Sequence, residues 1–173
     1  MKALLIIIFI LSSIPSFALR SLPENLTKDW KEKTVFFGVN KAWDYLKQEH
    51  TTLTYLARDE AFEYEKFNEE KYWQGLIEAR KLGLKFAGIS NWKINKKSIE
   101  KLGPQQLLIK VEGTYSVKRG LVHFIEWQLF SGEEYHQVAL LQDKDSYHPV
   151  PKAHIPQLMG NILKLNEKKK GLK

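Results

Sequence analysis

Apolar and polar side chains alternate most regularly over residues 106–118, QLLIKVEGTYSVK. Every second position belongs to one set, which is Leu107, Ile109, Val111, Tyr115 and Val117. A period of two predicts a strand with one face in the core and the other mostly wet, as is typical of antiparallel sheets. Arg119-Gly120 supplies a turn after it.

Residues 123–141, HFIEWQLFSGEEYHQVALL, combine histidines, glutamates and aromatic residues, which raises the question of a metal or acid–base site. We predict a hairpin instead, with strands 121–130 and 135–142 joined around 131–134. This register pairs Phe130 with Tyr135 and Leu129 with His136, and places His123 opposite Gln142. The two histidines then share a face but lie about 20 Å apart. A two-residue Ser-Gly turn would leave about 13 Å between them, and an intermediate register would place them on opposite faces. No simple register therefore lets both histidines bind one ion.

Two segments show helical periodicity. The first has Asn68 as its cap, acidic residues in its first turn and Gly83 as its end. One face of this helix carries Trp73, Leu76, Ile77 and Arg80 at helical spacing, with Tyr72 at the margin. The second spans 154–166, accepts Pro156 near its start, and carries the stripe Ile155, Leu158, Met159, Ile162 and Leu163.

The remaining segments are predicted less sharply. Residues 34–39 and 85–94 read as strands, and 95–104 as a lysine-rich connection. Residues 40–50 could be a short helix or a loop. The alternating segments 51–58 and 60–67 could form a hairpin or one bent strand.

Together these elements predict one α+β domain over 34–166, with an antiparallel sheet of about five to seven strands and two principal helices. Short turns between strands exclude a parallel, doubly wound sheet. The expected core comprises Phe37, Trp73, Leu76, Ile77, Ile109, Val111, Tyr115, Ile125, Trp127, Leu129, Ile162 and Leu163.

The first eighteen residues resemble a secretory signal. Lys2 precedes the apolar run 3–11, and small residues occupy the positions before a cleavage site between Ala18 and Leu19. Residues 19–33 follow as a polar lead-in, ordered only in part. The chain contains no cysteine, so the fold depends on its apolar core, and cysteine chemistry is excluded. We expect an exported, periplasmic or secreted protein.

Of the formal net charge of +7, the last ten residues contribute +4. This distribution argues against a basic face for nucleic acid. We expect the residues beyond Asn166 to leave the helix as a solvated tail, 167–173. Any contact with an anionic surface or membrane would be peripheral and would use Lys164, Lys168, Lys169, Lys170 and Lys173.

Glu126 is the one candidate for catalysis, because Phe124, Ile125 and Trp127 surround it in the sequence. A carboxyl group among apolar side chains can act as a general acid. The structural alternative is that Glu126 pairs with a lysine or arginine across the strands. No second acid or nucleophile can be placed beside it, and the sequence contains no metal-ligand or cofactor fingerprint.

These observations favour a non-catalytic binding or assembly module, with an unknown protein or small ligand as its partner. The alternative is a carboxylate-dependent, hydrolase-like enzyme with Glu126 in a cleft beside the 121–142 hairpin. We expect no cofactor and no bound metal in the favoured case.

Element order and hydrophobic spacing over about residues 33–166 resemble the PsbP-like family. The segments that carry the resemblance are FGVNKAWDYL (37–46), YWQGLIEARKLG (72–83), and the run from LLIKVEGTYSV to YHQVALLQD. The resemblance implies an α/β/α sandwich around an antiparallel sheet, and a non-enzymatic role in supporting protein complexes. It assigns no ligand residues to this chain. A cone-shaped α+β fold of the nuclear-transport-factor type is the rival.

Overall fold

A computed structural model describes residues 21–34, 39–86, 88–144 and 149–170. Seven strands form one antiparallel sheet in the order β1-β2-β3-β7-β6-β5-β4. The strands are β1 (Trp30–Lys33), β2 (Lys41–Tyr45), β3 (Thr51–Asp59), β4 (Ser90–Gly103), β5 (Gln106–Val117), β6 (Gly120–Ser131) and β7 (Glu134–Asp143). The helical elements are α2 (Glu24–Thr27), the 3-10 turn η1 (Tyr64–Lys66), α3 (Glu69–Phe86) and α4 (Pro149–Lys170).

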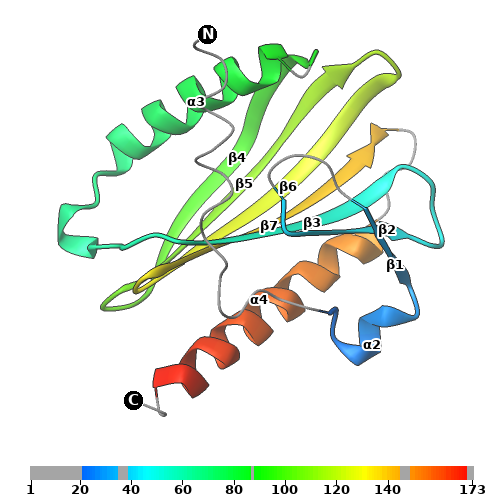
Figure 1. Ribbon diagram of the computed structural model, residues 1–173. Coiled ribbons are helices and arrows are strands. Elements are labelled where there is room, and N and C mark those ends of the chain that lie inside the picture. The colour runs from blue at the N-terminus through cyan, green and yellow to red at the C-terminus, as the bar shows by residue number, and fades with distance from the viewer. Residues whose placement is uncertain (1–20, 35–38, 87, 145–148, 171–173) are drawn as a thin grey trace, which may run out of the picture.

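The two long helices lie on opposite faces of the sheet, α3 on one side and α4 on the other (Figure 1). Each helix therefore buries one set of alternate strand residues. In β6, for example, Ile125 and Leu129 pack on the side of α4, and Phe124 and Phe130 belong to the cluster on the side of α3. The predicted α+β class with an antiparallel sheet is confirmed.

The central hairpin has the predicted register. Phe130 pairs with Tyr135, Leu129 with His136, and His123 with Gln142. The strands continue one residue further on each side, so that only Gly132 and Glu133 remain in the turn. Gly132 adopts a φ of 66°, which suits glycine at the first central position of a type II′ hairpin turn.

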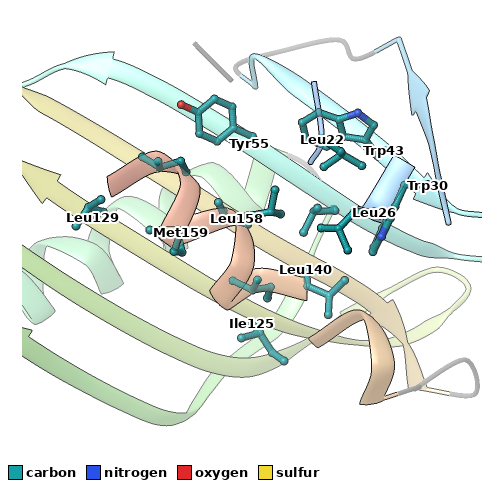
Figure 2. Packing of buried hydrophobic residues seen from close by; sticks show 14 of the residues in the cluster. Leu22, Leu26, Trp30, Trp43, Tyr55, Ile125, Leu129, Leu140, Leu158 and Met159 are labelled. Atoms are coloured by element: carbon teal, nitrogen blue, oxygen red, sulfur yellow. The ribbon is translucent and has the colours of Figure 1, made fainter. Parts of the chain in front are cut away.

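The α4 face holds the larger core. The predicted stripe of α4 packs there, and Figure 2 shows two of its members, Leu158 and Met159, among the buried residues of this cluster. Ile155, Leu158 and Ile162 are each at most 2% exposed. Opposite them lie Leu53, Tyr55, Leu129 and Leu140 from the strands, together with Leu22, Leu26 and Trp30 from the N-terminal segment. Burial of an aliphatic side chain of this size stabilises a fold by about 1.5–3 kcal/mol, so this stripe anchors α4.

The second cluster, on the α3 face, is less completely covered. Its buried members include Trp73, Leu107, Ile109, Val111 and Phe124. Other members, such as Leu76, Tyr115 and Tyr72, are only partly buried. Because both sheet faces are covered, the expectation of one wet face in residues 106–118 is wrong at Leu108, which is 7% exposed and packs on the α4 side.

The folded region begins earlier than the sequence pattern indicated. Within the expected lead-in 19–33, residues 24–27 are helical and 30–33 form β1, and three apolar side chains of this stretch are buried. The expected strand 34–39 and its core residue Phe37 lie mainly outside the described residues. Residues 41–45, read as helix or loop, form β2 because Ala42, Trp43 and Tyr45 are buried against the core.

Two further boundaries differ from the sequence prediction. Residues 60–67 form no strand but contain η1. Residues 95–103 of the predicted lysine-rich connection 95–104 belong to β4, an edge strand with three register shifts. Exposed lysines and bulges are a common means of protecting a sheet edge from pairing with another chain.

Helix α3 runs past Gly83, contrary to the prediction, and ends at Phe86. Gly88 has a φ of 66°, and the Ile89 amide donates to the Leu84 carbonyl at 2.9 Å, as in a Schellman motif. The predicted cap is confirmed, since the Lys71 amide donates to Asn68 Oδ1 at 2.9 Å.

Helix α4 is also longer than predicted, beginning at Pro149 and continuing to Lys170. The expectation that the backbone leaves the helix after Asn166 is therefore wrong. Among the described residues, no helix combines the length and apolar character needed to cross a membrane.

Candidate functional site beneath helix α3

A groove of about 720 Å³ separates α3 and the 60–68 segment from strands β6 and β7. This volume lies within the range of small-molecule binding sites. Its lining combines apolar and polar side chains: Arg58, Glu60, Ala61, Phe62, Glu63, Lys66, Phe67, Asn68, Lys71, Tyr72, Gly75, Leu76, Ala79, Arg80, Gln128, Phe130, Tyr135 and Gln137. The groove therefore forms where α3 leaves part of the sheet uncovered.

Arg80 of the groove lining forms a partly buried ion pair with Glu126, which lies behind it. The Arg80 Nη2 donates to Glu126 Oε1 at 2.7 Å and to Oε2 at 2.6 Å. The glutamate side chain is 6% exposed and the arginine side chain 35%. The cation thus comes from α3, not from a neighbouring strand as the structural alternative supposed.

A chain of hydrogen bonds continues from this ion pair across the floor. Gln128 Nε2 donates to Glu126 Oε1, and the Tyr72 hydroxyl donates to Gln128 Oε1 at 2.5 Å. A separate hydrogen bond lies on the neighbouring strand, β7. There Gln137, which pairs with Gln128, accepts from the Tyr135 hydroxyl at 3.1 Å. Burial raises the pKa of both tyrosines, and the Glu126 carboxylate raises them further, so both hydroxyls stay protonated donors at neutral pH.

Aromatic rings line one end of the groove. The rings of Phe62 and Phe130 lie 4.9 Å apart, and those of Phe130 and Tyr135 lie 5.0 Å apart. The Arg58 guanidinium sits 4.5 Å from the Tyr135 ring centroid and forms an ion pair with Glu60. This wall can take up a flat or aliphatic group by burying apolar area.

A smaller cavity of about 230 Å³ adjoins the groove. Leu76, Arg80 and Gln137 line both spaces, so they mark the boundary between them. The smaller cavity is mainly apolar, with Trp92 and Phe124 among its walls. The combined site thus has an aromatic end, a polar middle and an apolar end.

The arrangement around Glu126 suits binding better than proton transfer. Both carboxylate oxygens already accept hydrogen bonds, from Arg80 and Gln128. Its charged partner is a guanidinium, which does not deprotonate in proteins and so does not complete an acid–base pair. Within the described residues, no cluster of three or more histidine and carboxylate side chains is arranged to hold a metal ion.

Of the other residues singled out from the sequence, Lys164 lies away from this site. Lys164 is an exposed residue of α4, on the opposite face of the sheet (Figure 1). The backbone of 168–170 is helical, while Ala18, Leu19 and Lys173 lie outside the described residues. The structure does not bring Glu126 and Lys164 together.

The sequence prediction missed most of the groove. It placed Arg80 on the core face of its helix and did not select Gln128, Gln137, Tyr72 or Phe62 for binding. One signal was present: polar residues recur at period two on one face of the hairpin, as Glu126-Trp-Gln128 and Tyr135-His-Gln137. Polar positions on a buried sheet face point to a hydrogen-bonded network or a ligand site.

Fold and groove together define a single-domain α/β/α sandwich with an antiparallel sheet and a ligand-sized opening beneath one helix.

No family model matches the chain, and no curated protein matches it. Among solved structures, the chain resembles cyanobacterial PsbP (CyanoP) from Synechocystis sp. PCC 6803. That match has a TM-score of 0.54 and 12% identity, and covers 73% of this chain and 76% of the other.

The chain therefore has a PsbP-like fold, as the element order predicted. A second structure, the protein of unknown function PA94 from Pseudomonas aeruginosa, matches at a TM-score of 0.41 and 8% identity. Its coverage is 84% of this chain and 83% of that one, but the similarity is too low to support an argument.

Proposed function

We propose that this chain is an exported, non-catalytic module that binds a protein segment or small ligand in the groove beneath α3. The observation that carries the proposal is the groove itself, which is ligand-sized and has an aromatic wall beside a hydrogen-bonded floor. Preformed concave sites with a few polar groups in an apolar lining are the usual form of binding sites.

A binding role is favoured over catalysis by the state of Glu126. A general base needs a free lone pair directed at its substrate, and a general acid needs a proton. Here the carboxylate is held by a guanidinium at 2.6–2.7 Å and by the Gln128 amide. Such a pair serves to fix the wall of the site and to orient Arg80.

Export is supported by the sequence of residues 1–18, in which a lysine, an apolar run and small residues follow in the order of a secretory signal. The test is a fusion of the whole chain to alkaline phosphatase, which is active only outside the bacterial cytoplasm. We expect activity from the native fusion and its loss when Ile7→Lys interrupts the apolar run. Equal activity of both fusions would contradict export through this segment.

Binding in the groove can be tested by site-specific crosslinking, because the chain contains no cysteine that would compete for the label. Ala79→Cys places a single thiol on the exposed groove lining, and Glu49→Cys places one on an exposed position outside that lining. Both variants are labelled with benzophenone maleimide and irradiated in a cell-envelope extract. A specific adduct at position 79 alone supports the proposal, whereas identical adducts at both positions, or none at 79, contradict it.

A further inference from the structure

We propose that the groove takes a small monocarboxylate with an apolar body, and that Arg80 and Gln137 bind its carboxylate. This inference rests on the proposed binding function and adds the chemical class of the ligand. It follows from which hydrogen-bonding groups of the floor are already used and which still face the open space.

Arg80 uses only part of its hydrogen-bonding capacity. A single nitrogen, Nη2, contacts both oxygens of Glu126. Guanidinium carries five N–H donors, and within the described residues no acceptor contacts those on Nε and Nη1. The side chain is 35% exposed and lines both cavities, so these donors are accessible to a ligand. The N–H groups of a planar guanidinium lie side by side, at a spacing that lets two of them donate to the two oxygens of one carboxylate.

Gln137 offers a second set of donors beside this cation. Its Oε1 accepts from the Tyr135 hydroxyl, and its amide nitrogen supplies the donors. Among the described residues no acceptor contacts that nitrogen. Because Gln137 lines both cavities, as Arg80 does, the two residues meet at the same boundary.

The acceptors of the floor, by contrast, each already receive at least one hydrogen bond. Both Glu126 oxygens accept from Arg80, Gln128 Oε1 accepts from Tyr72, and Gln137 Oε1 accepts from Tyr135. The open part of the polar floor therefore consists mainly of donors. A ligand with hydrogen-bond acceptors can bind to these donors. An ammonium group, which is itself a donor and a cation, would face other N–H donors and the positive charge of the guanidinium, so its binding is disfavoured.

The charge of the lining favours one negative charge on the ligand. Two cations of the lining form ion pairs within it, Arg58 with Glu60 and Lys66 with Glu63, each at 2.6 Å. Arg80 is balanced by Glu126, behind it. Lys71, an exposed residue of the lining on the first turn of α3, is the remaining cation of the described lining. The net charge is therefore close to +1.

The apolar body of the ligand has room on either side of the polar boundary. Phe62, Tyr72 and Phe130 provide an aromatic surface in the larger space, and the smaller space of about 230 Å³ is lined mainly by apolar side chains. A phenyl ring or short aliphatic chain fits this division, and burying its surface adds to binding.

Three probes of nearly equal shape test the selectivity for the head group: 4-phenylbutyrate, its amide, and 4-phenylbutylamine. Their binding to the full chain is measured by isothermal titration calorimetry at pH 7. We expect the acid to bind at least tenfold more tightly than the amide, and the amine to give no measurable heat. Comparable affinities for all three probes would overturn the assigned head group.

Gln137→Glu is the sharpest variant, because it keeps the acceptor for Tyr135 and exchanges the donor amide for a second carboxylate. We expect it to weaken binding of 4-phenylbutyrate at least tenfold. Gln157→Glu, an exposed position of α4, makes the same change in charge on the opposite face and should leave the affinity unchanged. Arg80→Lys keeps the positive charge but removes the lateral donors, and should also weaken binding of the acid at least tenfold.

Circular dichroism of each variant confirms that it remains folded before titration, and Arg80→Lys provides a second test if Gln137→Glu does not fold. Unchanged affinity in both folded groove variants, or no binding of the acid at 10 mM, would show the proposal to be wrong. The crosslinking at Ala79→Cys is independent of this outcome. An adduct there without acid selectivity retains the groove as a binding site and rejects only the ligand class.

Discussion

The ion pair between Arg80 and Glu126 makes a strong prediction about stability. Replacing the arginine by methionine retains much of the apolar stem of the side chain and removes the charge. The Glu126 side chain, 6% exposed, then keeps only the Gln128 amide as a hydrogen-bond donor among the contacts described. Breaking a buried ion pair from one side leaves an uncompensated charge in a poorly solvated place.

The expected cost follows from the burial of the two partners. Removing one partner of a fully buried pair costs about 3–5 kcal/mol. Arg80 is 35% exposed, so water reaches the site and the lower end applies; we expect Arg80→Met to lower the free energy of unfolding by about 3 kcal/mol. For a chain of this length that corresponds to a fall of roughly 6–12 °C in Tm.

The double variant Arg80→Met with Glu126→Met separates charge from packing. With both charges removed, the site becomes apolar, and such replacements are often neutral. We expect the double variant to recover at least half of the stability that Arg80→Met loses. Urea unfolding followed by tryptophan fluorescence measures each free energy, with equal m-values as the check that the unfolding reaction is unchanged.

Two results would refute this reasoning. A loss below about 1 kcal/mol in Arg80→Met would mean that water or another group solvates Glu126 without the arginine. A double variant less stable than Arg80→Met alone would mean that the carboxylate contributes through packing and hydrogen bonds rather than through the ion pair.

Three further predictions concern other parts of the molecule. In Gly113→Ala, the new Cβ would lie 2.1 Å from the Lys93 carbonyl oxygen, so we expect a loss of about 2–3 kcal/mol in urea unfolding, and a cost near zero would contradict this packing. Burial lowers the pKa of His154, whose Nδ1 accepts from the Trp30 indole at 3.0 Å. Because the unfolded state then binds the proton more readily, stability should fall as pH decreases through about 6.5 and level off below the lowered pKa, and His154→Gln should weaken this dependence. Deleting 167–173 should change Tm little and reduce sedimentation with anionic liposomes at low salt, whereas equal sedimentation of both chains would assign the tail no membrane contact.

The central hairpin could be predicted from sequence because two local signals agree there. The alternation of side chains determines which residues share a face, and the Ser-Gly-Glu-Glu segment limits where the chain turns. A register error of one residue would have moved Ile125 and Leu129 from the α4 face of the sheet to the α3 face. The same reasoning works for α4, where a single apolar stripe faces the sheet.

Short strands and bulged strands were misread because their periodicity is broken. Strand β2 has only five residues, and its adjacent Ala42 and Trp43 are both buried. Strand β4 contains register shifts, one of them between Ile94 and Lys96, so its apolar residues do not follow a period of two. Its lysines protect an edge, and the pattern they produce resembles that of a loop.

The site was harder to predict because it depends on contacts between distant segments. Arg80 and Glu126 are 46 positions apart, and both occur in amphipathic patterns that have a purely structural explanation. Periodicity indicates that each side chain faces the interior side of its element. Only the packing of α3 determines that they meet, and that space remains beside them.

The two faces of the sheet explain why the groove lies where it does. On the α4 side, Ile155, Leu158 and Ile162 are almost fully buried, so that helix is seated closely on its face of the sheet. On the α3 side, Leu76 is only partly buried, and the polar residues of β6 and β7 give the helix no continuous apolar surface to cover. A helix seated fully over those strands would have to cover Gln137 and leave its amide donors unpaired, at a cost of about 1–3 kcal/mol. The same polar residues that keep α3 from closing the sheet are therefore the ones that equip the opening to bind a ligand.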